Sequence, residues 1–226
     1  MADATQLVER INESGALQNL SPPVQTALFL GCLVLLPAAL VCLTSFTRII
    51  IVLSFVRRAV TSQEIPPNSV LTGLSLFLTL FVMAPTLDRI DKEALTPYLN
   101  KELNAQEAFA HGATPLREFM LRQTRRQDLA LFVHLSAGPA PERPEDASFQ
   151  CLVPAFVISE LKTAFLMGFL ISLPFLLVDL VVSSVLTSMG MVMMPPAVIS
   201  APFKLLLFVL ADGWHLIAQA LSSSFA

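Results

Sequence analysis

The chain has 226 residues, of which 54% are hydrophobic and only 14% are charged. Soluble domains usually carry about 25% charged residues, so this composition indicates a membrane protein with at most one modest water-facing domain. The net charge of −3 excludes a strongly basic nucleic-acid-binding surface, and we expect no nucleic acid among the partners.

Residues 1–23 form a polar N-terminal leader. Asp3, Glu9 and Glu13 oppose the positive charge that begins a cleavable signal peptide, so we do not expect the leader to be one. Residues 24–87 then predict a first apolar helical hairpin. Its arms, 24–46 and 69–87, are each long enough to cross a bilayer at about 1.5 Å per residue.

Basic residues near the turn of this hairpin set its expected orientation. Arg48, Arg57 and Arg58 favour the cytoplasmic side of the membrane. Two crossings then place the following residues on the periplasmic side.

Residues 88–150 carry eight Lys or Arg and ten Asp or Glu, more than half of all the charge in the chain. We expect a small helical periplasmic-side domain here, ending in a Pro-rich linker over 138–144. Thr114 and Pro115 are typical of an N-cap followed by the first residue of a helix.

Residues 151–226 predict a second apolar helical hairpin, with a methionine-rich loop at its turn. Proline lacks a backbone donor and clashes with the preceding helical turn. Kinks or breaks are therefore expected at four prolines of this hairpin: Pro174, Pro195, Pro196 and Pro202.

Five charges lie within the seventy mostly apolar residues 152–221: Glu160, Lys162, Asp179, Lys204 and Asp212. Charges in apolar spans normally pair with one another or line a polar route. Glu160 and Lys204 lie at opposite ends of an antiparallel hairpin, so a pair within one chain is awkward and a pair between copies is favoured. The alternative is that long side chains reach the membrane interface.

Four of the six residues in 189–194 are methionine. Methionine is flexible and polarizable, so a ring of such loops could close a pore and still yield to a passing chain. Ordinary apolar packing of the loop is the simpler alternative. A Cu(I) site is the weaker hypothesis, because no further Met or His cluster occurs at ligand spacing.

Signatures of catalysis are missing from the sequence. His111, His134 and His215 are isolated, and no nucleophile elbow, zinc-protease helix or phosphate loop is present. We therefore expect no enzyme activity and no cofactor. A stand-alone small-solute carrier or channel would also explain buried charges, but it predicts an internal repeat, and none is convincing between 24–90 and 152–221.

Several strings together resemble the FliP family, the flagellar branch of the type III secretion export-gate proteins. They are 44–49 (TSFTRI), 66–68 (PPN), 156–165 (FVISELKTAF), 174–179 (PFLLVD), 189–196 (MGMVMMPP), 202–210 (PFKLLLFVL) and 212–214 (DGW). The resemblance covers roughly 40–90 and 150–222. The injectisome export-gate counterpart is the neighbouring alternative.

The resemblance implies an all-α, membrane-associated protein whose kinked hairpins assemble into a helical ring, expected to be a pentamer. Implied partners are FliQ-like and FliR-like small membrane proteins, FlhB-like and FlhA-like export components, and exported unfolded proteins, in the flagellar basal body of the bacterial inner membrane. The charges in the apolar arms would be contacts between subunits. The pore gasket implied by the family loop consists of Met189, Met191, Val192, Met193 and Met194.

Overall fold

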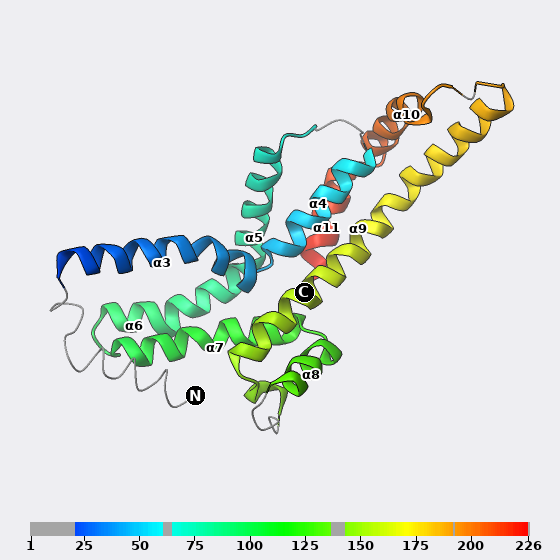
Figure 1. Cartoon of the computed structure of the whole chain (residues 1–226). Helices are drawn as coiled ribbons and strands as arrows, with labels where there is room; N and C mark the ends of the chain where they lie inside the picture. The colour runs from blue at the N-terminus through cyan, green and yellow to red at the C-terminus, as the bar shows by residue number, and fades with distance from the viewer. Residues whose placement is uncertain (1–20, 61–64, 137–142, 192, 226) are drawn as a thin grey trace.

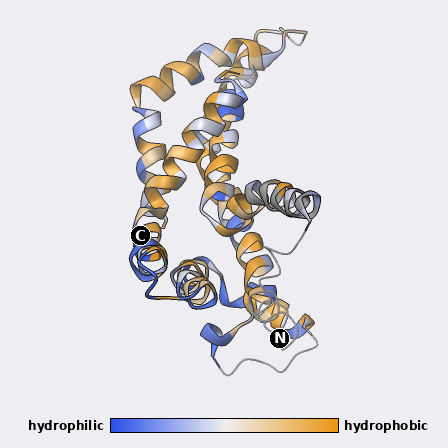
Figure 2. Cartoon of the chain, turned by 90° about the vertical axis from the view of Figure 1, so that its left-hand side faces the viewer, coloured by the Kyte–Doolittle hydropathy of each residue, from blue (hydrophilic) through white to orange (hydrophobic). Residues whose placement is uncertain are grey.

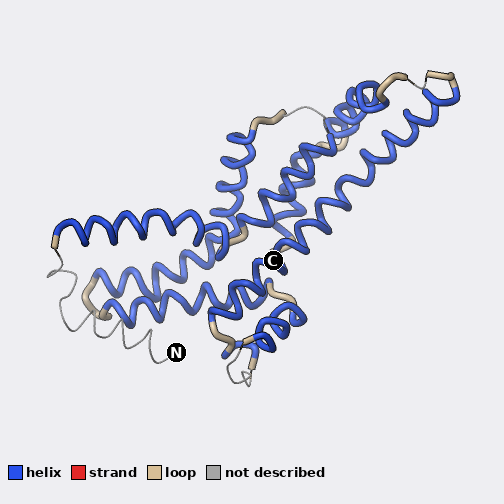
Figure 3. The backbone as a smooth tube through the Cα atoms, viewed as in Figure 1, coloured by secondary structure: helices blue, strands red, loops and turns tan. Residues whose placement is uncertain are grey.

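The computed structural model describes residues 21–60, 65–136, 143–191 and 193–225. The first 20 residues of the predicted leader, most of the predicted linker and Val192 lie outside these ranges. Every regular element within them is helical (Figure 3). The elements are α3 (Pro22–Leu43), α4 (Phe46–Val60), α5 (Asn68–Ile90), the π-helix η1 (Asp91–Leu95), α6 (Thr96–Leu99), α7 (Ala105–Gln123), α8 (Arg126–Leu135), the 3-10 turn η2 (Pro144–Asp146), α9 (Phe149–Ser188), α10 (Pro196–Leu210) and α11 (Gly213–Ser223).

The molecule is elongated, and its helices do not pack into one layer. In Figure 1, α4 and α10 lie beside the 40-residue helix α9 in one long arm that also holds α11, and the arm ends at the loop between α9 and α10. Helices α6 and α7 extend in another direction, and α8 packs against the first turns of α9. The two predicted hairpins are therefore not separate, because α4 of the first lies along α9 of the second.

The first predicted arm, 24–46, forms the helix α3, and the chain bends at the end of that arm. Helix α3 ends at Leu43, and the segments Pro37–Leu43 and Phe46–Val60 meet at an angle of 82°. The hydroxyl of Thr44 turns back to donate to the carbonyl oxygen of Leu40 at 2.5 Å. This local hydrogen bond takes the place of the next helical turn.

The second predicted span is longer than expected. Helical structure continues from Asn68 through Pro85 and η1 to Leu99, giving 32 residues. The predicted end at residue 87 is therefore wrong. A π-type turn follows Pro85 by a few residues, and such turns occur where a helix accommodates a local irregularity.

The start of α7 also differs from the prediction at Thr114. The side chain of Asn104 accepts hydrogen bonds from the backbone N–H groups of Gln106 and Glu107, at 3.0 and 2.9 Å. Glu107 Oε2 accepts from the backbone N–H of Asn104 at 3.0 Å, which completes a capping box. Pro115 lies buried inside this helix. The stronger cap ten residues upstream therefore decides where the helix begins.

Helix α7 is tied to α5 at its surface. Arg89 donates to Glu93 Oε1 at 3.1 Å and to Glu118 Oε2 at 2.5 Å. The hydrogen bond from Arg89 lowers the pKa of the Glu118 carboxyl below its ordinary value. Both partners are about half exposed, so the bridge contributes little to stability.

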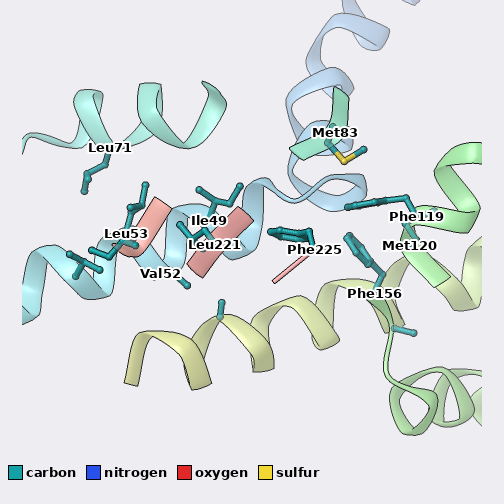
Figure 4. Packing of buried hydrophobic residues seen from close by; sticks show 14 of the residues in the cluster. Ile49, Val52, Leu53, Leu71, Met83, Phe119, Met120, Phe156, Leu221 and Phe225 are labelled. Atoms are coloured by element: carbon teal, nitrogen blue, oxygen red, sulfur yellow. The ribbon is translucent and has the colours of Figure 1, made fainter. Parts of the chain in front are cut away.

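The core lies where α4, α7, α9 and α11 meet. Ile49, Met120, Leu152 and Leu221 are at most 1% exposed there. Phe119, Phe156 and Phe225 form a neighbouring aromatic group (Figure 4). This core fixes the base of the long arm.

Hydrophobic residues run along the long helices, as Figure 2 shows, and many of them are exposed away from this core. Phe77, Phe81, Leu180 and Leu210 are at least 70% exposed. By length and composition, the segments 68–99 and 149–188 could each cross a membrane, and two bent helix pairs could raise the number of spans to four. Such a surface suits lipid or other subunits rather than water.

Candidate functional site: a buried polar junction and a methionine tip

A buried ion pair joins the two apolar halves of the chain. Arg48 at the start of α4 donates from Nε to Glu160 Oε2 on α9 at 2.9 Å, and its Nη2 donates to Oε1 of the same carboxylate. The side chains of Arg48 and Glu160 are 2% and 0% exposed. This two-point geometry is the strongest arrangement available to a guanidinium and a carboxylate. It holds α4 and α9 in one register.

Arg48 also holds the end of α11 and the end of α7. Its Nη1 donates to the carbonyl oxygen and to the hydroxyl of Ser224, each at 3.0 Å. Its Nη2 donates to Gln123 Oε1 at 3.0 Å. The guanidinium carbon lies 3.9 Å from the centre of the Phe225 ring, close enough for a cation–π contact. One side chain thus connects four helices.

A second polar contact attaches α8 to the same turn of α9. Ser159 donates to Asp128 Oδ2 at 2.7 Å and accepts from the backbone N–H of Arg125 at 3.0 Å. Arg125 also donates from Nη2 to Thr163 Oγ1 at 3.3 Å. Residues 159 and 160 therefore bind two different parts of the chain on neighbouring faces of α9.

A third cluster crosses the second hairpin. Lys204 on α10 donates to Asp179 Oδ2 on α9 at 2.5 Å, and Ser200 donates to Asp179 Oδ1 at 2.5 Å. Lys204 is 12% exposed and Asp179 is 33% exposed. This pair sets the register between α9 and α10.

Glu160 and Lys204 do not meet within one chain, as their sequence positions suggested. Each already has a partner in that chain, which the sequence did not identify: Arg48 for Glu160 and Asp179 for Lys204. A Glu160–Lys204 pair between copies stays a prediction. Because Glu160 is fully buried in a single chain, that pair would require both groups to exchange partners.

The other two predicted charges are exposed. Lys162 lies on the outer side of α9, and Asp212 precedes α11 with a left-handed backbone at φ 50°. Within the ranges that the structure describes, neither side chain makes an ion pair or a hydrogen bond. The expectation that Asp212 is paired is therefore not met in one chain.

The methionine loop forms the free end of the long arm (Figure 1). Met189, Met191, Met193 and Met194 are 66%, 40%, 99% and 41% exposed. Gly190 has φ 75°, a conformation that glycine adopts without strain, and it ends α9. The four methionines are therefore presented outward and do not fill a core of their own chain.

The prolines act differently along this hairpin. Pro195 precedes α10 and Pro196 is its first residue, so both lie at the turn. Pro174 and Pro202 lie inside continuous helices, so neither breaks its helix, and a kink at either proline stays a prediction. A proline in a long apolar helix loses one hydrogen bond, and packing of neighbouring helices offsets that loss.

Arg48 is the main residue whose role the sequence analysis missed. It was assigned to the basic cytoplasmic turn, but its side chain is buried, which leaves Arg57 and Arg58 as the basic residues there. One signal in the sequence could have identified this role. Arg48 lies between two apolar runs with no acidic residue nearby, so a buried arginine there needs a carboxylate from a distant part of the chain. Among the described residues, no three His, Cys, Asp or Glu side chains group as metal ligands.

A family model described as the FliP family matches residues 29–221. The chain belongs to the FliP family. The matched range holds the Arg48–Glu160 pair, the Asp179–Lys204 pair and the whole methionine tip of this FliP-family protein.

Curated relatives agree with this assignment, and each of the three described next carries the name "Flagellar biosynthetic protein FliP". The Bacillus subtilis (strain 168) protein is 52% identical over 208 residues, covering 92% of this chain and 94% of the relative. The Pectobacterium carotovorum protein is 55% identical over 202 residues, covering 89% and 78%. The Aquifex aeolicus (strain VF5) protein is 45% identical over 209 residues, covering 92% and 87%.

Proposed function

We propose that this FliP-family chain is a structural and gating subunit of the flagellar type III protein export gate. Its relatives are named for flagellar biosynthesis, and its long apolar helices fit a membrane-embedded component. The proposed location is the flagellar basal body in the bacterial inner membrane. Energy for export would come from partner components, since the chain has no nucleotide-binding loop.

The methionine tip is the observation that carries the gating part of the proposal. Four flexible apolar side chains are held at the end of a rigid two-helix arm, where one chain leaves them exposed. Copies arranged around an axis would bring these tips together and bury them against one another. Thioether side chains adapt to irregular neighbours, so such a ring would exclude water at rest and part around an unfolded chain.

The proposed assembly is a homo-oligomer, expected to be a pentamer. Small FliQ-like and FliR-like proteins would complete the ring, and FlhB-like and FlhA-like components would deliver substrate. The large exposed apolar area of α5, α9 and α10 supports partners of this kind. A monomer or dimer in detergent, without small helical partners, would instead favour a solute carrier.

The gating proposal predicts an ion leak. Changing Met191 and Met193 together to alanine removes two of the four methionine side chains from the tip, so the assembled gate should pass small solutes at rest. Ion flux into vesicles holding the purified complex measures this leak. Leu180→Ala, which removes a 70% exposed side chain from the α9 surface, is the control and should leave the vesicles tight. Equal flux in the wild type and the double variant would overturn the gasket.

A further inference from the structure

The second hairpin satisfies three of its five charges within one chain. Glu160 is bound by Arg48, and Asp179 by Lys204. Lys162 and Asp212 remain, both exposed and both without an ionic partner among the described residues. One of these two remaining charges is positive and the other is negative.

Lys162 lies among apolar side chains on its own face of α9. The side chains around it on α9, one or two turns away, are exposed and apolar: Ile158, Phe165, Leu166 and Phe169, at 40%, 54%, 52% and 54%. A lipid-facing surface of this kind strongly disfavours an unpaired ammonium group. The face is better suited to a protein partner that brings a negative charge.

Asp212 lies in a matching apolar setting. It occupies the bend of 63° between α10 and α11. Val209, Leu210 and Leu216 nearby are 66%, 76% and 52% exposed. Its carboxylate makes no cap hydrogen bond to α11, so all of its acceptor positions are open. This face requires a positive charge from outside the chain.

We propose that Lys162 pairs with Asp212 of the partner subunit, so that the α9 face of one copy docks on the α10–α11 face of the next. This inference rests on the proposed homo-oligomer and names its contact. The two faces are different surfaces of the same chain, so the contact is head-to-tail and repeats around an axis. Along such a series each Lys162 meets the Asp212 of the next copy, so unpaired charges remain only at the two ends.

The same pair fixes an axial shift between copies. The Asp179–Lys204 pair shows which positions of α9 and α10 lie level in the hairpin. By that register Asp212 is level with Ile171, nine residues along α9 from Lys162. At about 1.5 Å per residue this separation is about 14 Å. Successive copies would thus be displaced along the arm, which is consistent with the helical ring that the family resemblance implies.

Cross-linking tests the contact while both charges stay in place. Leu166→Cys and Ala211→Cys are combined in a chain whose three native cysteines are changed to alanine. Oxidation of membranes should give a ladder of dimers and larger species, whereas each single-cysteine variant should stay monomeric on a denaturing gel. A disulfide within one chain does not increase its mass on the gel, so the ladder reports bonds between chains. A double-cysteine chain that stays monomeric overturns the contact.

A neutralisation cycle tests the charges themselves. Lys162→Met keeps the apolar stem, and Asp212→Asn keeps a residue that tolerates the left-handed backbone. Each single variant leaves one charge uncompensated, so the assembled fraction on a native gel should fall at least tenfold. The double variant should recover most of it, because neither unpaired charge remains.

Exposed charges of the 88–150 segment provide the matched control. Lys92→Met and Glu102→Gln should leave the assembled fraction unchanged. If the losses of assembled fraction at 162 and 212 add up in the double variant, the two charges do not form a pair. If neither single variant loses assembled fraction, the pair is also excluded, and Lys162 reaches water. An oligomer that forms without the 166–211 cross-link would refute this contact and leave the proposed gate standing. A wild-type chain that never oligomerises would refute the proposed function itself.

Discussion

At the scale of single residues, Arg48 shows how a charge is accommodated in an apolar core. Its guanidinium has five N–H donors, and these bind a carboxylate, a side-chain amide and both oxygen atoms of Ser224. The ring of Phe225 covers its face. Removing any one partner would leave buried donors without acceptors. The cluster therefore acts as a single junction.

This junction predicts a large cost for removing Glu160. Glu160→Ala leaves Arg48 buried without its counter-charge, which should reduce the free energy of unfolding by about 3–5 kcal/mol. Thermal unfolding of the purified protein in detergent measures the loss. The comparison is Glu93→Ala, whose side chain is 41% exposed in its bridge to Arg89 and should cost less than about 1 kcal/mol. Similar losses for the two variants would contradict the assigned role of Arg48.

At the scale of elements, α4 and α9 approach closely because Gly168 has no side chain. A Cβ atom at this position would lie 2.6 Å from Cγ and 2.9 Å from Cβ of Phe55. Those atoms lie near the α4 backbone, so they cannot move aside without moving the helix. The close approach lets the Arg48–Glu160 pair and the Phe55–Phe165 edge contact form on the same interface.

Gly168→Ala should therefore destabilise the protein despite the better helix propensity of alanine. We expect a loss of about 1–3 kcal/mol from overpacking, measured by thermal unfolding, and partial recovery when Phe55→Ala makes room. Gly73→Ala on α5 is the control, because a Cβ there meets nothing within 4 Å. That change should be neutral or stabilising by up to about 1 kcal/mol. If Gly168→Ala behaves like Gly73→Ala, the close approach is not a constraint.

At the scale of the whole molecule, the division of charge predicts how the chain lies across the membrane. Arg57 and Arg58 precede the turn before α5, whereas the acidic and basic residues of 88–150 gather around α6, α7 and α8. Arginine in short loops favours the cytoplasmic side. The 88–150 segment is then expected in the periplasm.

Labelling of single cysteines tests this orientation. Glu102→Cys should react with a membrane-impermeant thiol reagent while the inner membrane is intact. Arg58→Cys should react only after that membrane is opened. Both substitutions are made in a chain whose native cysteines have been replaced. The same cysteine-free chain without either substitution gives the background labelling. If position 58 is labelled while the membrane is intact and position 102 only after it is opened, the topology is the reverse of the proposed one.

The sequence by itself determined the class of the protein, its two apolar halves, the charged segment between them and the turn at Pro195 and Pro196. Composition, apolar run length and the missing donor of proline act locally, and they can be read along the chain. The family resemblance rested on local strings of the same kind and is confirmed by the family match.

Only the tertiary structure decided which charges meet. Arg48 and Glu160 are 112 residues apart, and no local pattern links them. The tertiary structure also keeps α9 helical at Pro174, where the sequence predicted a kink or break. It buries Arg48, which the sequence analysis assigned to the basic turn. The physical reason is the same in each case. A buried charge or a missing helical hydrogen bond is tolerated when packing brings compensating groups from elsewhere in the chain.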